Sequence, residues 1–471
     1  MKKRRIILLL TVTILVAIST GLYYAFELIS TGVAYKAKNL CSGVFVSKRS
    51  PESVLNSDLA VNSHPVLRHI DVKADRITQT SMASFLGLIV RSATFQPGFG
   101  CTLAFAGYEH RLPAPSNTDT TVHDTKPGVW LENPETVKAA TNVDHGRLDA
   151  ALDWAFSEPD AERPRRTRAV VVVHKGHIIA ERYAPGFDEN TPLLGWSMTK
   201  SVMNALVGIL VEQGRLSLTD PVHMPEWKES EDGRNTITLN HLLQMSSGLD
   251  FNEDDSDPLA DVVHMLFREP DMATYAASKK LVANPGSRWR YSSGTTNIVS
   301  AIVRRAIGDS DYFLFPRRAL FEPLGMDSAV IEPDSGGTFV GSSYMYATAR
   351  DWAKFGQLYL QDGIWQGQRM LPEGWVRYST TPAPQAVNHE YGAHFWLKLP
   401  DEYVSADYAG RLPEDAFHAI GHEAQFVSVI PSHELVVVRL GLSRYVSTWQ
   451  HDKFLSKVLE AVKDGVSSTM N

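Results

Sequence analysis

The spacing of apolar residues places strands near both ends of the last two-thirds of the chain and helices between them. Apolar runs rich in valine and isoleucine predict strands, whereas apolar positions three and four residues apart predict helices. The predicted strands are residues 169–174, 177–182, 424–430 and 434–442, and the predicted helices are 144–156, 239–245, 259–267, 295–307, 349–360 and 447–462. This order indicates one sheet assembled from both ends of a domain, with a helical insertion and a cleft between the two parts.

The first two strands form a predicted hairpin that leads into an apolar helix. Lys175 and Gly176 separate the strands, and glycine accommodates the positive φ that a two-residue turn requires. The stretch from Gly195 to Lys200 then runs into an apolar segment from Val202 to Val211. We therefore expect this helix to line the cleft beside the sheet.

The amino terminus has the pattern of a membrane anchor. Basic residues at positions 2–5 precede an uncharged apolar run from Ile6 to Phe26, which is long enough to cross a bilayer as a helix. No small-x-small cleavage site follows between Thr20 and Gly32, so an uncleaved anchor is favoured over a signal peptide. The basic residues should stay in the cytoplasm, which places the rest of the chain on the periplasmic side of a bacterial inner membrane.

Between the anchor and the predicted domain, short apolar runs are broken by proline, asparagine, serine and threonine, and we expect irregular structure there. Cys41 and Cys101 both lie in this segment and outside the reducing cytosol. A disulfide is their natural pairing, and two buried thiols are the alternative. The expected organisation is an anchor (1–30), an irregular lead-in (31–140), a main domain (141–466) and a short tail (467–471).

Composition narrows the class of partner. The 471 residues are 44% hydrophobic and 21% charged, as in a globular protein with a full core. The net charge of -7, and the absence of a basic stripe after the first five residues, argue against a nucleic-acid partner. A small-molecule substrate and the membrane are the partners that the sequence favours.

Ser197 and Lys200 form a Ser-x-x-Lys motif at the start of the apolar helix. Residues three apart share one helix face, so the Lys200 amine can reach the Ser197 hydroxyl. The helix N-terminus would favour an oxyanion near Ser197 and help to lower the pKa of Lys200. A chain of this length contains about one or two such motifs by chance, so the surrounding pattern has to decide its meaning.

Two later segments supply further candidate residues. Tyr291, on a loop before a predicted helix, could act as a phenolate stabilised by Lys200 and carry protons. The alternative is that Tyr291 packs in the core while Ser293 caps the helix. The segment from Gly421 to Gln425 opens a strand, where a backbone N–H could complete an oxyanion hole and His422 could form a polar wall. Ordinary polarity at a sheet edge is the alternative.

Other classes of site are disfavoured. The acidic segment from Asp250 to Asp261 suggests calcium, but it does not match the EF-hand pattern, and a solvated loop near the cleft is favoured. No His-Glu-x-x-His or paired-cysteine motif suggests zinc, and no Gly-x-Ser-x-Gly elbow suggests an α/β-hydrolase.

From about residue 144 to residue 462 the chain resembles the serine β-lactamase-related superfamily, in the order hairpin, Ser-x-x-Lys helix, tyrosine loop and closing strands. The resemblance implies an α/β (α+β) fold, with an antiparallel sheet flanked by helices and an all-helical subdomain. It also implies that Ser197 is the acylated nucleophile, Lys200 its base and Tyr291 a second proton carrier. Backbone N–H groups of Ser197 and of a residue near Gln425 would form the oxyanion hole. Ser293, His422 and Gln425 would contact substrate, and neither a metal nor an organic cofactor is required.

Two departures from the family pattern bear on the substrate. Many penicillin-recognising relatives have Tyr-x-Asn and Lys-Thr-Gly, whereas this chain has Tyr291-Ser292-Ser293 and places His422 where the lysine would be. The motifs are closer in form to the esterase and 6-aminohexanoate-oligomer hydrolase branch. We therefore expect a serine hydrolase of an ester or amide. A catalytically silent protein that binds cell-wall peptides and a D-amino-acid peptidase or carboxypeptidase are the alternatives.

Overall fold

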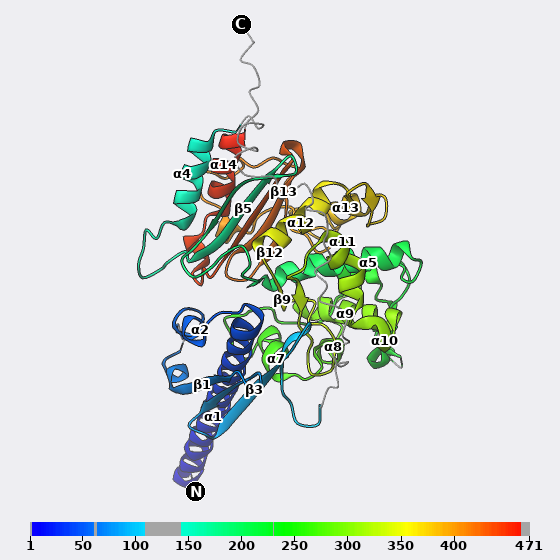
Figure 1. Ribbon diagram of the computed structural model, residues 1–471. Helices are drawn as coiled ribbons and strands as arrows, with labels where there is room; N and C mark the ends of the chain where they lie inside the picture. The colour runs from blue at the N-terminus through cyan, green and yellow to red at the C-terminus, as the bar shows by residue number, and fades with distance from the viewer. Residues whose placement is uncertain (1, 61–63, 109–142, 229, 463–471) are drawn as a thin grey trace.

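The computed structural model describes residues 2–60, 64–108, 143–228 and 230–462 (Figure 1). Its largest sheet has five antiparallel strands in the order β12-β13-β14-β5-β6. These strands are β5 (Thr167–His174), β6 (His177–Tyr183), β12 (Phe417–Gly421), β13 (Gln425–Ile430) and β14 (Leu435–Gly441). Because β14 pairs with β5, the two ends of the domain meet within one sheet, and the predicted fold class is confirmed.

The predicted hairpin is also confirmed, since Lys175 and Gly176 have φ of +51° and +79° between β5 and β6. The sequence pattern does not reveal β12, because His418 and Gly421 leave it with too short an apolar run.

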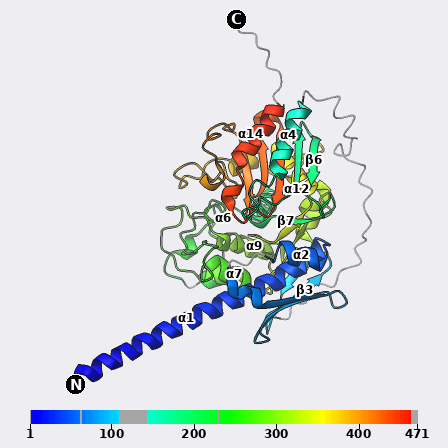
Figure 2. The same ribbon diagram turned by 90° about the vertical axis from the view of Figure 1, so that its left-hand side faces the viewer.

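Helices cover both faces of this sheet (Figures 1 and 2). On β5, Val170 and Val172 join one apolar cluster with α4 (His145–Phe156) and α14 (His451–Val462). The alternate residues of β5 face a second cluster that includes α12 (Ala349–Leu360). Since side chains alternate across a strand, a strand covered on both faces needs a continuous apolar run, as β5 has.

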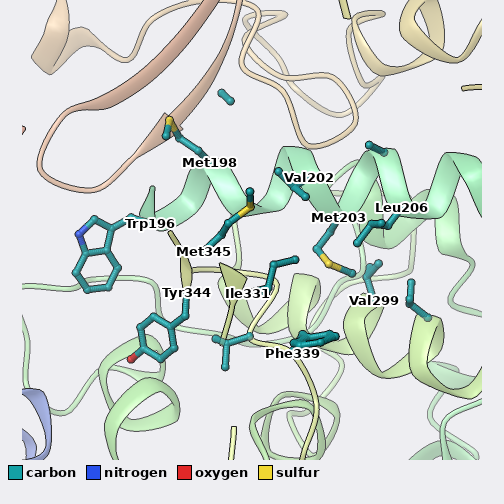
Figure 3. Close-up of a cluster of buried hydrophobic side chains, with 14 of the residues drawn as sticks. Trp196, Met198, Val202, Met203, Leu206, Val299, Ile331, Phe339, Tyr344 and Met345 are labelled. Carbon is teal, nitrogen blue, oxygen red and sulfur yellow. The ribbon is translucent and has the colours of Figure 1, made fainter. Parts of the chain in front are cut away.

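A helical region lies beside the sheet and completes the domain (Figure 1). Its helices are α5 (Thr199–Glu212), α6 (Leu239–Leu243), α7 (Asp261–Arg268), α8 (Met272–Ala277), α9 (Ser293–Ile307), α10 (Asp309–Tyr312), α11 (Glu322–Leu324) and α13 (Trp375–Ser379). Short strands join its loops: β7 (Leu193–Leu194), β8 (Val330–Ile331), β9 (Met345–Ala347), β10 (Ile364–Trp365) and β11 (Gln368–Arg369). In Figure 3, Val202, Met203 and Leu206 of α5 and Val299 of α9 belong to one buried apolar cluster.

The amino-terminal part consists of one long helix and a small sheet. The helix α1 (Lys2–Cys41) has an apolar stretch long enough to cross a membrane, and that stretch is exposed in the protein. The helix continues into a short π-helical segment (Ser42–Val46), and α2 (Pro51–Ser57) follows. The predicted disulfide between Cys41 and Cys101 is present.

We expected the lead-in to be irregular, but its described part contains a four-stranded antiparallel sheet in the order β1-β2-β3-β4. The strands are β1 (Ile70–Asp75), β2 (Thr80–Phe85), β3 (Ile89–Gln96) and β4 (Gly100–Leu103). The sheet packs on α1 through small residues, with Ala83 and Ala93 fully buried. Alanine has low β-propensity, so the pattern of strong strand formers is missing here. Residues 61–63 and 109–140 of the predicted lead-in lie outside the described residues.

A buried ion pair ties α1 to the main domain. The Lys38 ammonium donates to the carboxylate of Glu332, which also accepts from the Ser42 hydroxyl at 2.8 Å and the Cys101 N–H at 2.7 Å. Both charged side chains are almost completely buried. Such a pair is stable only where the remaining hydrogen bonds of the carboxylate are satisfied, as they are here.

Candidate active site

Ser197 lies in a tight turn that enters α5. Its neighbours Trp196 and Met198 are buried (Figure 3). Ser197 itself is half-buried. Trp196 has φ of +49°, a conformation that is uncommon for a bulky residue and that the surrounding packing must hold in place. The two buried neighbours therefore fix the turn and leave the Ser197 hydroxyl between the core and solvent.

Lys200 is buried and its amine is within hydrogen-bond distance of Ser197, as the spacing predicts. Its Nζ donates to Oγ of Ser197 at 2.9 Å, to Oγ of Ser293 at 3.0 Å and to the carbonyl oxygen of Ser342 at 2.9 Å. None of these three acceptors is charged. Burial lowers the pKa of Lys200 to about 8, and the negative charge of Glu253 opposes that shift. Burial, rather than the helix N-terminus that we invoked, is thus the principal cause.

Glu253 reaches this lysine through Ser293. The Ser293 N–H donates to Glu253 at 2.8 Å, and the Ser293 hydroxyl donates to the second carboxylate oxygen while accepting from Lys200. Burial raises the pKa of Glu253, against the opposing effects of Lys200 and of the Ser293 hydrogen bonds. The acidic loop that we expected near the cleft therefore directs one half-buried carboxylate into the site.

Ser293 is held within the protein by these contacts, whereas Ser292 caps α9 by accepting from the Thr295 N–H at 3.1 Å. The alternative that Ser293 caps the helix is therefore wrong, and its contact with substrate stays a prediction. Among the described residues, no three histidine, cysteine, aspartate or glutamate side chains converge in a way that could hold a metal.

Tyr291 lies beside Lys200, whose Nζ is 4.9 Å from the centre of its ring. We expected Lys200 to stabilise a phenolate, and this expectation is wrong. Burial and the charge of Glu253 raise the pKa of Tyr291, and an interaction with the Ser197 side chain only partly offsets them. The ring packs against Tyr391 and Trp396, with centroids 5.9 Å and 5.4 Å away. The raised pKa favours the protonated phenol of Tyr291.

His422 lies at the edge of the site, with its ring edge-on to Trp196 at 5.5 Å. Its Nδ1 is 2.8 Å from a carboxylate oxygen of Asp255, on the same acidic loop as Glu253. Burial lowers the pKa of His422, but the hydrogen bond to Asp255 and the charges of Glu423 and Asp255 outweigh it, so the pKa is raised. His422 is thus paired with a carboxylate of the acidic loop.

Gln425 uses its side chain to hold the turn between β12 and β13. Its amide donates to the carbonyl oxygens of His422 at 3.1 Å and Gly441 at 2.9 Å, and it accepts from the Gly441 N–H at 2.9 Å. At Gly421 an added Cβ would lie 2.0 Å from the Gly195 carbonyl oxygen, so only glycine fits this close approach. The end of β12 therefore lies directly against the turn that carries Ser197.

Residues 152–448 match the protein-family description Beta-lactamase, which covers more than half of the chain. The chain belongs to the beta-lactamase family. A relative of this beta-lactamase-family protein is the 6-aminohexanoate-dimer hydrolase of Paenarthrobacter ureafaciens, which is 31% identical over 246 residues. That match covers 49% of this chain and 61% of the relative, so the chain spans less than two-thirds of that hydrolase.

Solved structures also resemble the beta-lactamase-family domain. EstCE1, a hydrolase with promiscuous acyltransferase activity, has a TM-score of 0.53 at 15% identity, covering 68% of this chain and 99% of its own. A family VIII carboxylesterase has a TM-score of 0.51 at 14% identity, covering 68% of this chain and 96% of its own. At these identities the likeness shows the fold, and the curated relative shows that the family includes hydrolases.

Sequence reasoning missed several residues that this beta-lactamase-family site brings together. Glu253 and Asp255 do not belong to a recognisable sequence motif. The carbonyl oxygen of Ser342 is a backbone atom, so the residue type does not indicate its contact with Lys200. His394 is also buried here, with Nδ1 2.9 Å from the Lys200 carbonyl oxygen and Nε2 3.2 Å from Thr296. Burial and the charge of Lys200 lower its pKa to about 3, so it is a neutral link between α5 and α9.

Proposed function

We propose that this protein is a serine hydrolase that cleaves an ester or amide through an acyl-enzyme on Ser197. The observation that carries the proposal is the 2.9 Å hydrogen bond between Lys200 and Ser197, at a site where burial lowers the pKa of Lys200 to about 8. A neutral amine at that distance can take the hydroxyl proton as the serine oxygen attacks a carbonyl carbon.

In the proposed first step, the Ser197 oxygen bonds to the carbonyl carbon and its proton passes to Lys200. Backbone N–H groups of Ser197 and of a residue near Gln425 would stabilise the oxyanion. The bond to the leaving group then breaks, Tyr291 donates its proton to that group, and Lys200 reprotonates Tyr291. In the second step, water attacks the acyl carbon, Lys200 accepts its proton, and the carboxylic acid departs as Ser197 is reprotonated.

Ser293 and Glu253 act on Lys200 rather than on the substrate in this proposal. The carboxylate lies one hydroxyl away from the amine, so it stabilises the ammonium that forms when Lys200 takes the serine proton. The same contacts hold Nζ in line with Ser197.

Two observations support the proposed substrate class. Relatives include a 6-aminohexanoate-dimer hydrolase and, by fold, a carboxylesterase. In addition, His422, which we expect in the place of the lysine of Lys-Thr-Gly, is engaged by Asp255. Both support an ester or amide substrate over a β-lactam.

We also propose that α1 anchors the domain to the bacterial inner membrane. Ile6 to Phe26 would span the bilayer, and the basic residues at positions 2–5 would remain in the cytoplasm. The active site would then face the periplasm.

A fluorophosphonate probe and a p-nitrophenyl ester, applied to the detergent-solubilised full chain, test the proposed chemistry. Ser197→Ala should abolish labelling and reduce ester turnover by about 10³-fold or more. Ser278→Ala, which changes an exposed serine in the helical region, should leave both unchanged. Equal labelling and turnover in Ser197→Ala and the unmodified chain would refute the proposal.

A further inference from the structure

The turn between β2 and β3 exposes two leucines without an evident structural reason. Leu86 is 68% exposed and Leu88 is 83% exposed. The Leu88 N–H donates to the Phe85 carbonyl oxygen at 3.0 Å, and Leu86 and Gly87 have φ of +51° and +69°. Turns of this type favour asparagine and glycine at both central positions. Leu86 therefore serves neither the turn geometry nor the core.

The long helix gives this turn a defined position. At one end of β3, Phe95 stacks on Phe45 with ring centroids 5.6 Å apart. At the other end, an added Cβ on Gly32 would touch Ile70, which pairs with Phe85 at the end of β2. Strand β3 thus lies along α1 (Figure 1) and runs in the same direction as the helix.

The rise per residue of a strand and that of a helix agree with this placement. From Ile89 to Phe95 the strand advances about 20 Å, and from Gly32 to Phe45 the helical segments also advance about 20 Å. The turn and its leucine side chains extend about 7 Å beyond Phe85. That distance corresponds to the helix level of Phe26 and Glu27.

This level is where the apolar part of α1 ends. Glu27 is buried and pairs with Arg268, so the domain surface begins there, while Phe26 is 49% exposed. Tyr23 and Tyr24 are 58% and 42% exposed, and exposed tyrosines are typical of the boundary between bilayer and water. Figure 2 shows α1 projecting alone from the protein beyond this point.

We propose that the turn Leu86-Gly87-Leu88 inserts into the membrane surface beside α1 and gives the domain a second contact with the bilayer. The inference rests on the membrane span proposed above. Insertion at that depth transfers apolar side chains from water to the boundary of the lipid acyl chains, and this transfer is favourable. Two contacts, one helix and one turn, would restrict rotation of the domain about the axis of α1.

Site-specific labelling of the full chain in vesicles of phosphatidylethanolamine and phosphatidylglycerol tests this contact. Both native cysteines are in the disulfide, so Leu88→Cys introduces one reactive thiol for an environment-sensitive fluorophore. Ile77→Cys is the matched control, because Ile77 is 95% exposed in the β1–β2 turn at the opposite end of β2. Ile14→Cys, in the apolar part of α1, reports on the anchor itself.

Lipids with a quencher in the upper acyl chain should quench the fluorophore at residue 88 several-fold more strongly than at residue 77. Equal quenching at 88 and 77 would overturn the proposal, as would a blue shift at 88 without lipid quenching, which would indicate contact with a second copy of the chain. Quenching at 14 without quenching at 88 would reject the turn alone. Absence of quenching at both would reject the anchor with it, and neither result bears on the proposed hydrolysis.

Discussion

Lys38 and Lys200 are both buried lysines, and they differ in what their amines contact. Lys38 donates directly to the carboxylate of Glu332, whereas Lys200 donates to two hydroxyls and a carbonyl, with Glu253 reached only through Ser293. Burial lowers the pKa of both lysines, and a carboxylate opposes the shift in each case. The difference lies in direct contact with a carboxylate, which keeps Lys38 charged and leaves Lys200 able to give up its proton.

Two consequences follow for the molecule. The direct pair between Lys38 and Glu332 links α1 to the domain, next to the disulfide, and suits a structural role. The indirect arrangement around Lys200 suits proton transfer, because an amine with a pKa of about 8 can accept a proton near neutral pH.

The sharpest test of the comparison replaces each lysine by methionine. Lys200→Met should lower kcat/KM for a p-nitrophenyl ester by about 10³-fold, because the proposed base is removed while the chain still folds. Lys38→Met should lower stability but leave the kcat/KM of the folded fraction within about threefold, since Lys38 does not contact the site. Similar losses of kcat/KM in both variants would contradict the division of roles.

The second test concerns the carboxylate of the structural pair. Glu332→Gln should reduce the free energy of unfolding by about 3 kcal/mol, because it leaves a buried ammonium without its counter-charge. Denaturant titration of the solubilised chain measures this loss in the free energy of unfolding. Fluorophosphonate labelling at Ser197 reports the folded fraction at each denaturant concentration. Glu402→Gln, on an exposed residue, is the matched control and should change stability by less than about 0.5 kcal/mol.

The double variant Lys38→Met with Glu332→Gln separates the charge from the packing. It should be more stable than Glu332→Gln alone, because neither charge then remains unpaired. A double variant that is as unstable as the sum of the two single variants would show that the ion pair has no special role.

The same comparison explains how much could be predicted from the sequence. Ser197 and Lys200 are three residues apart, in the 3-10 turn that enters α5 and in the first turn of α5, so local geometry alone predicts their contact. Lys38 and Glu332 are 294 residues apart, and no local pattern indicates that pairing. Glu253 and Ser293 are 40 residues apart on a loop and a helix entrance, which places them beyond the reach of a motif as well.

Strand prediction shows the same limit in a different form. The main sheet was predictable because β5 and β14 are continuous apolar runs rich in valine. The sheet β1–β4 was not, because it packs on α1 through Ala83 and Ala93 rather than through strong strand formers. The raised pKa of Tyr291 was missed because its cause is burial, which the loop sequence does not reveal.

The smallest expected effect tests whether Glu253 acts on Lys200 by its charge. Glu253 raises the pKa of Lys200, so Glu253→Gln should lower that pKa and make the neutral amine available at lower pH. The dependence of kcat/KM on pH reports the pKa values of groups in the free enzyme. Its acid limb should move to lower pH by up to about one unit. The ratio of variant to unmodified activity should therefore rise as the pH falls. Loss of a merely structural contact would instead lower the activity by the same factor at every pH.

Glu253→Asp is the control, because it retains the charge. The acid limb of its kcat/KM profile should stay near that of the unmodified chain. An acid limb that moves equally in both variants would assign the effect to geometry rather than charge.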